Sequence, residues 1–174
     1  MTIKRVSLKK LALIAFSLLL VGCALPKNAE EFRQFTRNSP FKLIETYEVA
    51  RPLQDVSSTL KKKASECLAV TIDWTIDYGL LRPNRSGKDT YKPTFIATPK
   101  RAEIHVQLNR SAVTTIGSPP DGPYRVVLDA TSIEKNKTRI DTYVMSNVED
   151  GLILKAMRGW VTGDNLGCPD LTKK

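Results

Sequence analysis

Residues 69–77 have the sequence AVTIDWTID, in which apolar and polar side chains alternate along the whole stretch. Successive side chains of a β-strand point to opposite faces, so this period of two predicts a strand with one apolar and one polar face. The apolar face carries Val70, Ile72, Trp74 and Ile76. The polar face carries Thr71, Asp73, Thr75 and Asp77. Because antiparallel sheets commonly have one face on the core and the other in water, the stretch predicts an antiparallel sheet.

The same alternation predicts four further strands. They span Leu43–Ala50, Ala102–Leu108, Tyr124–Ile133 and Thr138–Met145. Turn-forming residues separate them, with Ser118-Pro119-Pro120-Asp121-Gly122-Pro123 before one strand and Lys135-Asn136-Lys137 closing the last hairpin. The segment from Gly79 to Pro93 is predicted to be a loop.

Two amphipathic helices are predicted beside the strands. The first begins at Pro52, a residue suited to the first position of a helix, and places on one side Leu53, Val56, Leu60, Ala64 and Cys67. The second begins at Ser146 or Asn147 and ends at Gly163, with apolar residues every four positions at Val148, Leu152, Ala156 and Trp160. Gly151 and Gly159 weaken the second helix and indicate close packing against another element.

The predicted element order is β-α-β-β-β-β-α. It indicates a single α+β domain over residues 44–174, in which an antiparallel sheet of about five strands carries both helices on one face. The other face is expected to be polar. This order of elements resembles the helix-grip arrangement of some envelope lipoprotein domains, including those attached to outer-membrane assembly machinery. The chain length suits one domain with a hydrophobic core.

The first 22 residues have the pattern of a secretory signal peptide. Residues 1–10 contain four basic residues and no acidic one, and an apolar run, interrupted only by Ser17, follows from Leu11 to Val21. This run is shorter than the roughly 20 residues that a membrane-spanning helix needs. Its end, Leu20-Val21-Gly22-Cys23, is similar to the lipobox of bacterial lipoproteins, in which a small residue precedes an invariant cysteine.

The resemblance to bacterial lipoproteins implies that residues 1–22 are removed and that Cys23 becomes the lipidated first residue. Its thiolate takes a diacylglyceryl group and its amine an acyl chain, and two or three chains anchor a protein stably. Residues 23–43 are then the lipid anchor and a tether, in which residues 29–37 are expected to form two helical turns. Ala24 after the cysteine implies the periplasmic face of the outer membrane rather than the inner membrane.

The mature chain carries a modest positive charge. Residues 1–22 hold four of the 27 basic residues and none of the 18 acidic ones, which leaves 23 basic residues against 18 acidic ones, or +5. This small excess and the exported location argue against a nucleic-acid partner. Anionic lipid headgroups, lipopolysaccharide or acidic cell-wall polymers fit the charge better.

Two cysteines, Cys67 and Cys168, remain after lipidation of Cys23. Because exported proteins fold in an oxidising compartment, this even number predicts a disulfide bond between them. The alternative is a pair of unpaired buried thiols. Two thiols and one histidine are too few for a usual zinc site, so neither a metal nor a cofactor is expected beyond the acyl chains on Cys23.

His105 is the only histidine, so any Ser-His-Asp or Cys-His site would have to use it. It lies on the polar side of a predicted strand, and no Gly-x-Ser-x-Gly motif accompanies it, so we interpret it as a solvated surface residue. Acid–base chemistry on glycans would need paired carboxylates, for which the candidates are Asp73, Asp77, Asp129 and Asp141. The strand period explains these as outward polar residues. No catalytic residue is therefore predicted.

Two surfaces are candidates for binding. The predicted loop carries Arg82, Arg85, Lys88 and Lys92, together with Tyr91. These side chains would suit an anionic or phosphorylated partner, and the alternative is an ordinary polar surface loop. The polar sheet face carries Arg125, Arg139, Tyr143 and His105. This face is either a partner surface or the solvent-facing side of the sheet.

These features predict a non-catalytic adaptor or accessory subunit of a cell-envelope assembly, with an envelope protein as its partner. One alternative is a lipid- or anionic-glycan-binding module that uses the concavity between the sheet and the last helix. Another is a cell-wall hydrolase or an inhibitor of such a hydrolase.

Overall fold

The computed structural model of the protein describes residues 25–40, 44–77, 84–111, 117–146, 148, 150–164 and 166–172. The predicted signal peptide, the lipidation site Cys23 and Arg82 lie outside these residues. Helices within the described residues are α2 (Ala29–Arg37), α3 (Leu53–Lys63), a π-helical turn that extends α3 (Ala64–Leu68) and α4 (Gly151–Thr162). The strands are β1 (Ile44–Val49), β2 (Thr71–Ile76), β3 (Arg85–Ala97), β4 (Arg101–Arg110), β5 (Tyr124–Glu134) and β6 (Lys137–Val144).

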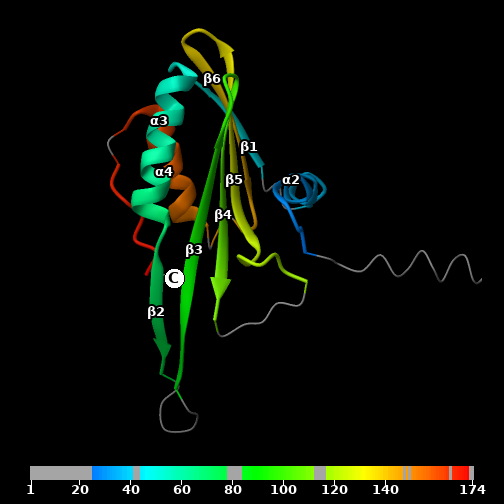
Figure 1. Ribbon diagram of the computed structural model, residues 1–174, viewed down its shortest axis with the longest axis vertical. Helices are drawn as coiled ribbons and strands as arrows, with labels where there is room; N and C mark the ends of the chain where they lie inside the picture. The colour runs from blue at the N-terminus through cyan, green and yellow to red at the C-terminus, as the bar shows by residue number, and fades with distance from the viewer. Residues whose placement is uncertain are drawn as a thin grey trace, which may run out of the picture.

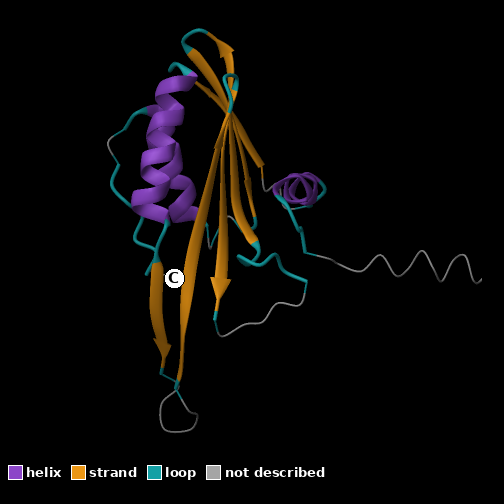
Figure 2. Ribbon diagram, in the orientation of Figure 1, coloured by secondary structure: helices purple, strands orange, loops and turns teal. Residues whose placement is uncertain are grey.

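The strands form one six-stranded antiparallel sheet in the order β1-β6-β5-β4-β3-β2. Helices α3 and α4 lie side by side on one face of this sheet, and α2 lies on the other face (Figures 1 and 2). We call the face under α2 the α2 face. The predicted α+β class is thus confirmed. The sheet has one strand more than expected, and α2 lies on the face that was expected to be polar and without a helix.

Strand β3 replaces much of the loop that was predicted from Gly79 to Pro93. Its sequence, RSGKDTYKPTFIA, contains glycine, lysine and proline, which are depleted in strands. The residue propensities therefore did not predict a strand here. Pairing with β2 ends at Tyr91, whose backbone N–H donates to the carbonyl of Val70. Pro93 therefore lies where that side of β3 is open, and its missing N–H costs no ladder hydrogen bond.

The main core lies between the sheet and the pair α3 and α4. The predicted apolar side of the first helix is confirmed, because its residues are buried there: Leu53, Val56, Leu60, Ala64 and Cys67. Trp160 of α4 is fully buried in the same core. Gly159 of α4 packs closely, as expected, because a Cβ there would lie 2.1 Å from Cδ1 of Leu166.

Helix α4 begins at Gly151, later than the predicted start at Ser146 or Asn147. The carboxylate of Asp150 accepts a hydrogen bond from the backbone N–H of Ser146 at 3.0 Å, which holds a turn ahead of the helix. Val148, predicted to lie on the apolar side of the helix, is consequently outside it and 91% exposed.

Helix α2 lies within the segment predicted to be a tether and is packed against the sheet. Its residue Phe32 is fully buried and forms a second apolar cluster with Val127 and Tyr143 of the sheet. Asn28 caps the helix by accepting a hydrogen bond from the N–H of Glu31 at 2.9 Å. The folded domain therefore begins before residue 44, and only the few residues between Cys23 and Asn28 are left for a tether.

A disulfide bond joins Cys67 in the π-helical turn to Cys168 in the tail after α4, with 4.9 Å between their Cα atoms. The predicted pairing is confirmed, and it links the end of the turn that extends α3 to the tail that follows α4. In the described part of the chain, no helix has both the length and the apolar character needed to span a membrane.

Candidate binding sites

The predicted basic cluster is divided between the two faces of β3. Strand alternation places Lys88 and Lys92 on the α2 face and Arg85 on the opposite one. Lys88 binds Asp73 of β2 at 3.5 Å, and Lys92 binds Asp121 at 2.5 Å. The structure does not gather these three cations into one anion-binding group, and each lysine already has a carboxylate beside it.

The ends of β2 and β3 form a projecting two-stranded arm, which we define as residues 73–76 and 85–88. In this arm the two strands pair with each other, whereas the register of β3 with β4 begins only at Asp89. Figure 1 shows the arm extending past the ends of the other strands. Ile76 on it is 46% exposed, and the indole N–H of Trp74 donates to Asp89 at 2.8 Å. From Arg85 onward the predicted loop is thus strand, and among the described strands none pairs with the outer edge of β2.

A buried ion network lies between α2 and the sheet. The guanidinium of Arg33 donates two hydrogen bonds to Asp129, at 2.9 and 2.7 Å, and also binds Glu103. Arg101 binds the same two carboxylates at 3.0 and 3.2 Å. Burial alone would lower the pKa of Arg33, but the hydrogen bonds and charges of Asp129 and Glu103 raise it above its ordinary value.

His105 belongs to this network and is not the solvated residue that was predicted. It is 8% exposed, and its Nε2 lies 2.9 Å from the carboxylate of Glu103. Burial alone would raise the pKa of Glu103, but its hydrogen bonds with His105 and Arg33 and the charges of Arg33 and Arg101 lower it. The packing of α2 and Tyr124 on this face covers His105, which the strand pattern predicted to be exposed to solvent.

The candidate carboxylate pair Asp129 and Asp141 lies on the α2 face, directly opposite each other in the register of β5 and β6. Asp129 binds the two arginines described above, and Asp141 accepts hydrogen bonds from Thr46 and Arg139. Both carboxylates thus serve as hydrogen-bond acceptors for neighbouring side chains, which is a structural arrangement.

Arg125 was predicted to share a face with Arg139, but it lies on the side of α4. The β4–β5 register shifts between Val106 and Gln107, and this bulge redirects the side chains of β5. The Nε of Arg125 donates to buried Asp150 at 3.0 Å, just ahead of α4. Arg110, at the end of β4, lies 3.5 Å from Asp89, which is also buried.

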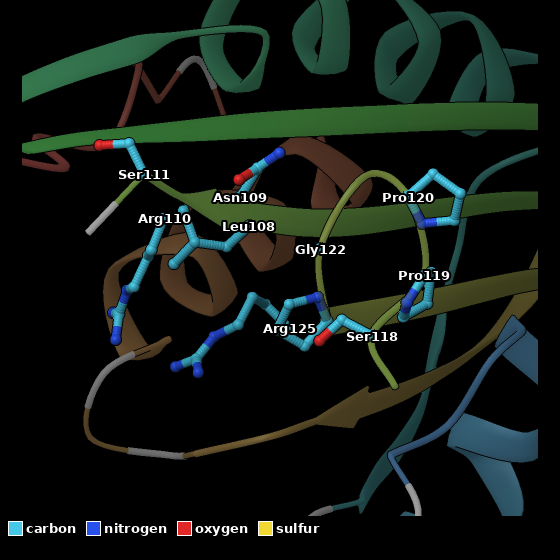
Figure 3. Close-up of a pocket in the computed structure, with 10 residues that line it drawn as sticks. Leu108, Asn109, Arg110, Ser111, Ser118, Pro119, Pro120, Gly122 and Arg125 are labelled. Carbon is cyan, nitrogen blue, oxygen red and sulfur yellow. The ribbon is translucent and has the colours of Figure 1, made fainter. Parts of the chain in front are cut away.

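A cavity of about 370 Å³ opens beside these two arginines. It lies between the end of β4, the start of β5 and the loop of residues 118–123 (Figure 3). In Figure 3, Arg110 and Arg125 extend to the same side, away from the turn that holds Pro119 and Pro120. The sequence identified this loop only as a turn, and no sequence signal pointed to a cavity, because its walls come from separate strands.

The described residues contain no group of three or more His, Cys, Asp or Glu side chains placed to hold a metal ion. Besides the arm and the cavity beside Arg110 and Arg125, the described residues form a larger hollow of about 540 Å³ between β1 and α4. This hollow, which is lined by Tyr47 and Val49 of β1 and by Arg158 and Thr162 of α4, lies between the sheet and the last helix, where the sequence suggested a concavity. The cavity beside the arginines is instead lined by β4, β5 and their connecting loop.

The chain matches no protein-family model and no curated protein. Among solved structures, a conserved protein from Geobacillus kaustophilus is 14% identical, with 70% of this chain and 90% of that chain covered and a TM-score of 0.33. Protein Ms6760 from Mycobacterium smegmatis is also 14% identical, with 70% and 85% covered and a TM-score of 0.31. At such TM-scores these likenesses carry no argument about this chain.

Proposed function

We propose that the protein is a non-catalytic lipoprotein that serves as an adaptor or accessory subunit of a cell-envelope assembly. In this proposal, acyl chains on Cys23 anchor it at the periplasmic face of the outer membrane, and its partner is an envelope protein. The observation that carries the proposal is the projecting arm of residues 73–76 and 85–88.

The arm has the properties of a surface that another chain can complete. In the part of the chain that the structure describes, β2 is the last strand of the sheet and no other strand pairs with its outer edge. Exposed edges of this kind accept an added strand, with main-chain hydrogen bonds supplying affinity and side-chain contacts supplying specificity. A two-stranded ribbon is only marginally stable in water, so a partner that covers Ile76 and the β2 edge would also stabilise the arm.

The docked helix α2 supports a role in which the domain is held close to the membrane. Only four residues lie between Cys23 and the helix cap Asn28, so the two positions are at most about 18 Å apart when the chain is fully extended. Because Arg33 and Phe32 fix α2 on the sheet, this short link would restrict how far the domain moves from its anchor. The arm, on the far edge of the sheet from β1, would remain available.

In-cell photo-crosslinking tests the partner proposal. A photoreactive amino acid replaces Ile76 on the arm in the full-length, membrane-anchored protein, and captured proteins are identified by mass spectrometry. Ile133 near the end of β5 is the matched control, because it is also an exposed isoleucine, at 41% against 46%. We expect one protein to be captured reproducibly from position 76 and not from position 133. Equal capture from both positions, or none from position 76, would overturn the assignment of the arm.

Lipidation is tested separately with a palmitate analogue supplied to growing cells. The wild-type protein should be labelled and should fractionate with the outer membrane, whereas Cys23→Ala should be unlabelled. Label retained by the variant, or recovery of the labelled wild type in the inner membrane, would contradict the proposed anchor or its location.

A further inference from the structure

A row of apolar side chains along β2 is partly open to solvent on a strand at the edge of the sheet. Its members alternate along the strand and share one of its faces: Val70, Ile72, Trp74 and Ile76. Ile76 is 46% exposed, and the other three are half-buried. Exposed apolar edges are normally protected from pairing by charges, prolines or bulges. Residues 70–76 contain no proline, and their one charged residue, Asp73, lies on the other face.

The ladder between β2 and β3 decides which backbone groups of β2 point outward. The N–H of Tyr91 donates to the carbonyl of Val70, so Val70 and every second residue after it direct their backbone groups toward β3. The N–H and C=O groups of the residues between them, Thr71, Asp73 and Thr75, therefore point to the outer edge. No described strand pairs with this edge, so an added strand would bond to these three residues.

A hollow of about 220 Å³ beside the start of β2 complements the exposed side chain near the end of the strand. The apolar part of its lining consists of Cys67, Val70, Ile72, Pro169 and Leu171. Ile76, the exposed side chain, lies four residues beyond Ile72 on the same face. When two copies of β2 lie antiparallel with their Trp74 residues opposite each other, Ile76 of each copy lies opposite Ile72 of the other. Each isoleucine is then placed beside the hollow of the other copy.

From this self-complementary pattern we propose that β2 pairs with β2 of a second copy of this chain. The strands run antiparallel and are centred on Trp74, and the two sheets become one. A two-fold interface uses the same surface on both subunits, so Ile76 of each copy occupies the hollow of the other. The two Trp74 side chains form a non-hydrogen-bonded pair, the position at which side chains of neighbouring strands lie closest.

The polar face favours this register over its two neighbours. With the Trp74 residues opposite each other, Asp73 lies opposite Thr75 of the other copy, and both have outward-pointing backbone groups to bond. Centring the pair on Asp73 would place two aspartates opposite each other, and centring it on Thr75 would place Asp73 opposite Asp77. Like charges directly opposite each other are destabilising. In the register centred on Trp74 the two Asp73 residues are only diagonal neighbours, and each lies 3.5 Å from its own Lys88.

The other edge strand, β1, does not have this self-complementary pattern. Centring an antiparallel pair of β1 strands on Thr46 places a glutamate opposite Ile44, and centring it on Tyr47 places a glutamate opposite Val49. Charged side chains would thus lie against apolar ones in either register. The pattern therefore selects β2 as the edge that pairs with its own copy.

The dimer regulates the site of the proposed adaptor role, and this regulatory part rests on that role. A second copy and an envelope partner need the same outer edge of β2, so they cannot bind together. The dimer covers the apolar row of β2 until a partner displaces the second copy. Pairing by itself depends only on the sequence and geometry of β2.

Sedimentation equilibrium of the full-length protein, purified in density-matched detergent, tests the dimer. We expect the wild type to change from monomer to dimer as its concentration rises. Thr75→Pro removes an outward N–H and leaves the bonds with β3 in place, so the variant should dimerise at least about tenfold more weakly. Thr75→Ala is the matched control, because it keeps the N–H, and its dimer should match that of the wild type.

A second variant tests the side-chain contact in the hollow. Ile76→Lys places a charge against Ile72 and should weaken the dimer, whereas Ile133→Lys, at an exposed isoleucine outside the arm, should not. Circular dichroism checks that each variant is folded. A wild type that stays monomeric would overturn the proposal. A dimer that persists in both Thr75→Pro and Ile76→Lys would overturn β2 as its interface.

Cysteine trapping in membranes that carry the full-length protein tests the register. Trp74→Cys brings two thiols into a non-hydrogen-bonded pair, in which Cα atoms are about 4.5 Å apart, close enough for a disulfide. Ile76→Cys is the control, because its two copies would lie four residues apart along the strands, roughly 13 Å. We expect Trp74→Cys to form a covalent dimer at least about tenfold faster. Equal rates, or no covalent dimer of Trp74→Cys, would overturn the register.

The dimer and the adaptor role fail in different experiments. A monomeric wild type would remove the dimer and leave the capture of an envelope protein from position 76 unaffected. Conversely, a dimer in detergent and no envelope protein captured in cells would keep the pairing of β2 and remove the adaptor role.

Discussion

Arg33 of α2 binds Asp129 of β5 through two parallel hydrogen bonds, from Nε to Oδ2 at 2.9 Å and from Nη2 to Oδ1 at 2.7 Å. The two residues are 96 positions apart in the chain, and both side chains are buried. This contact joins a helix from the predicted tether to the centre of the sheet. It makes the segment that follows the proposed lipid anchor a part of the folded domain.

Replacing Arg33 with alanine should destabilise the domain strongly. The change leaves Asp129 and Glu103 buried with one guanidinium fewer, and breaking a buried ion pair costs about 3–5 kcal/mol. We expect a loss of about 3 kcal/mol, at the low end of that range, because Arg101 still binds both carboxylates. Urea unfolding measures the change, and exposed Gln34→Ala on the same helix is the control. A loss no larger than that of the control would show that α2 contributes little to stability.

The lowered pKa of Glu103 predicts an acid-dependent contribution to stability. A carboxyl group whose folded-state pKa lies below its ordinary value of 4.5 stabilises the fold above that value. The contribution is lost as the pH falls through the lowered folded-state pKa. The difference in unfolding free energy between the wild type and Glu103→Gln should therefore be constant near neutral pH and shrink in acid. Urea titrations across this range measure it, and a difference that persists or grows in acid would contradict the assignment.

Two glycines with similar backbone angles should respond differently to alanine. Gly117 and Gly122 have φ of 82° and 88°, a region that costs other residues about 1–2 kcal/mol. A Cβ on Gly117 meets no atom within 4 Å, whereas one on Gly122 would lie 2.3 Å from the carbonyl oxygen of Leu108. Gly122→Ala should therefore lower the unfolding free energy by about 1–3 kcal/mol more than Gly117→Ala. Thermal unfolding of the two variants provides the comparison, and equal losses would mean that the loop moves away from β4 at little cost.

Removing the disulfide should lower stability without changing the fold. Cys67 and Cys168 close a loop with a sequence separation of 101, for which the chain-entropy model gives about 4.7 kcal/mol and measured losses are about 2–5 kcal/mol. Thermal unfolding of the wild type with and without reductant should show this loss. In the double variant Cys67→Ala, Cys168→Ala, reductant should have no effect. Free labelling of both thiols in unfolded, unreduced wild type would contradict the bond itself.

Local patterns in the sequence were sufficient for the main layer of the fold. The alternation in residues 69–77 and the spacing of Leu53, Val56 and Leu60 each describe which side of a segment is apolar. Such a pattern lies within one strand or a few helical turns, so it can be recognised without knowing which other segments pack against it. The pairing of Cys67 with Cys168 was also predicted, because only two cysteines were left to pair.

Other features depended on contacts between distant segments, and the local patterns did not contain them. Strand β3 is stabilised by β2 and β4 on either side, which outweighs its content of glycine, lysine and proline. The bulge beside Val106 turned Arg125 from the predicted polar face toward Asp150. This reversal follows from the pleat, because a shift of one residue moves a side chain to the other face of a sheet.

The sequence by itself thus determined the α+β class, the apolar sides of α3 and of most of the strands, and the cysteine pair. Only the tertiary structure decided that α2 covers one face of the sheet, that His105 is buried, and that Arg110 and Arg125 line one cavity. The physical reason is that burial and ion pairing are properties of a site built from several segments. Arg33 and Asp129 acquire their low-dielectric surroundings only when α2 and β5 pack together.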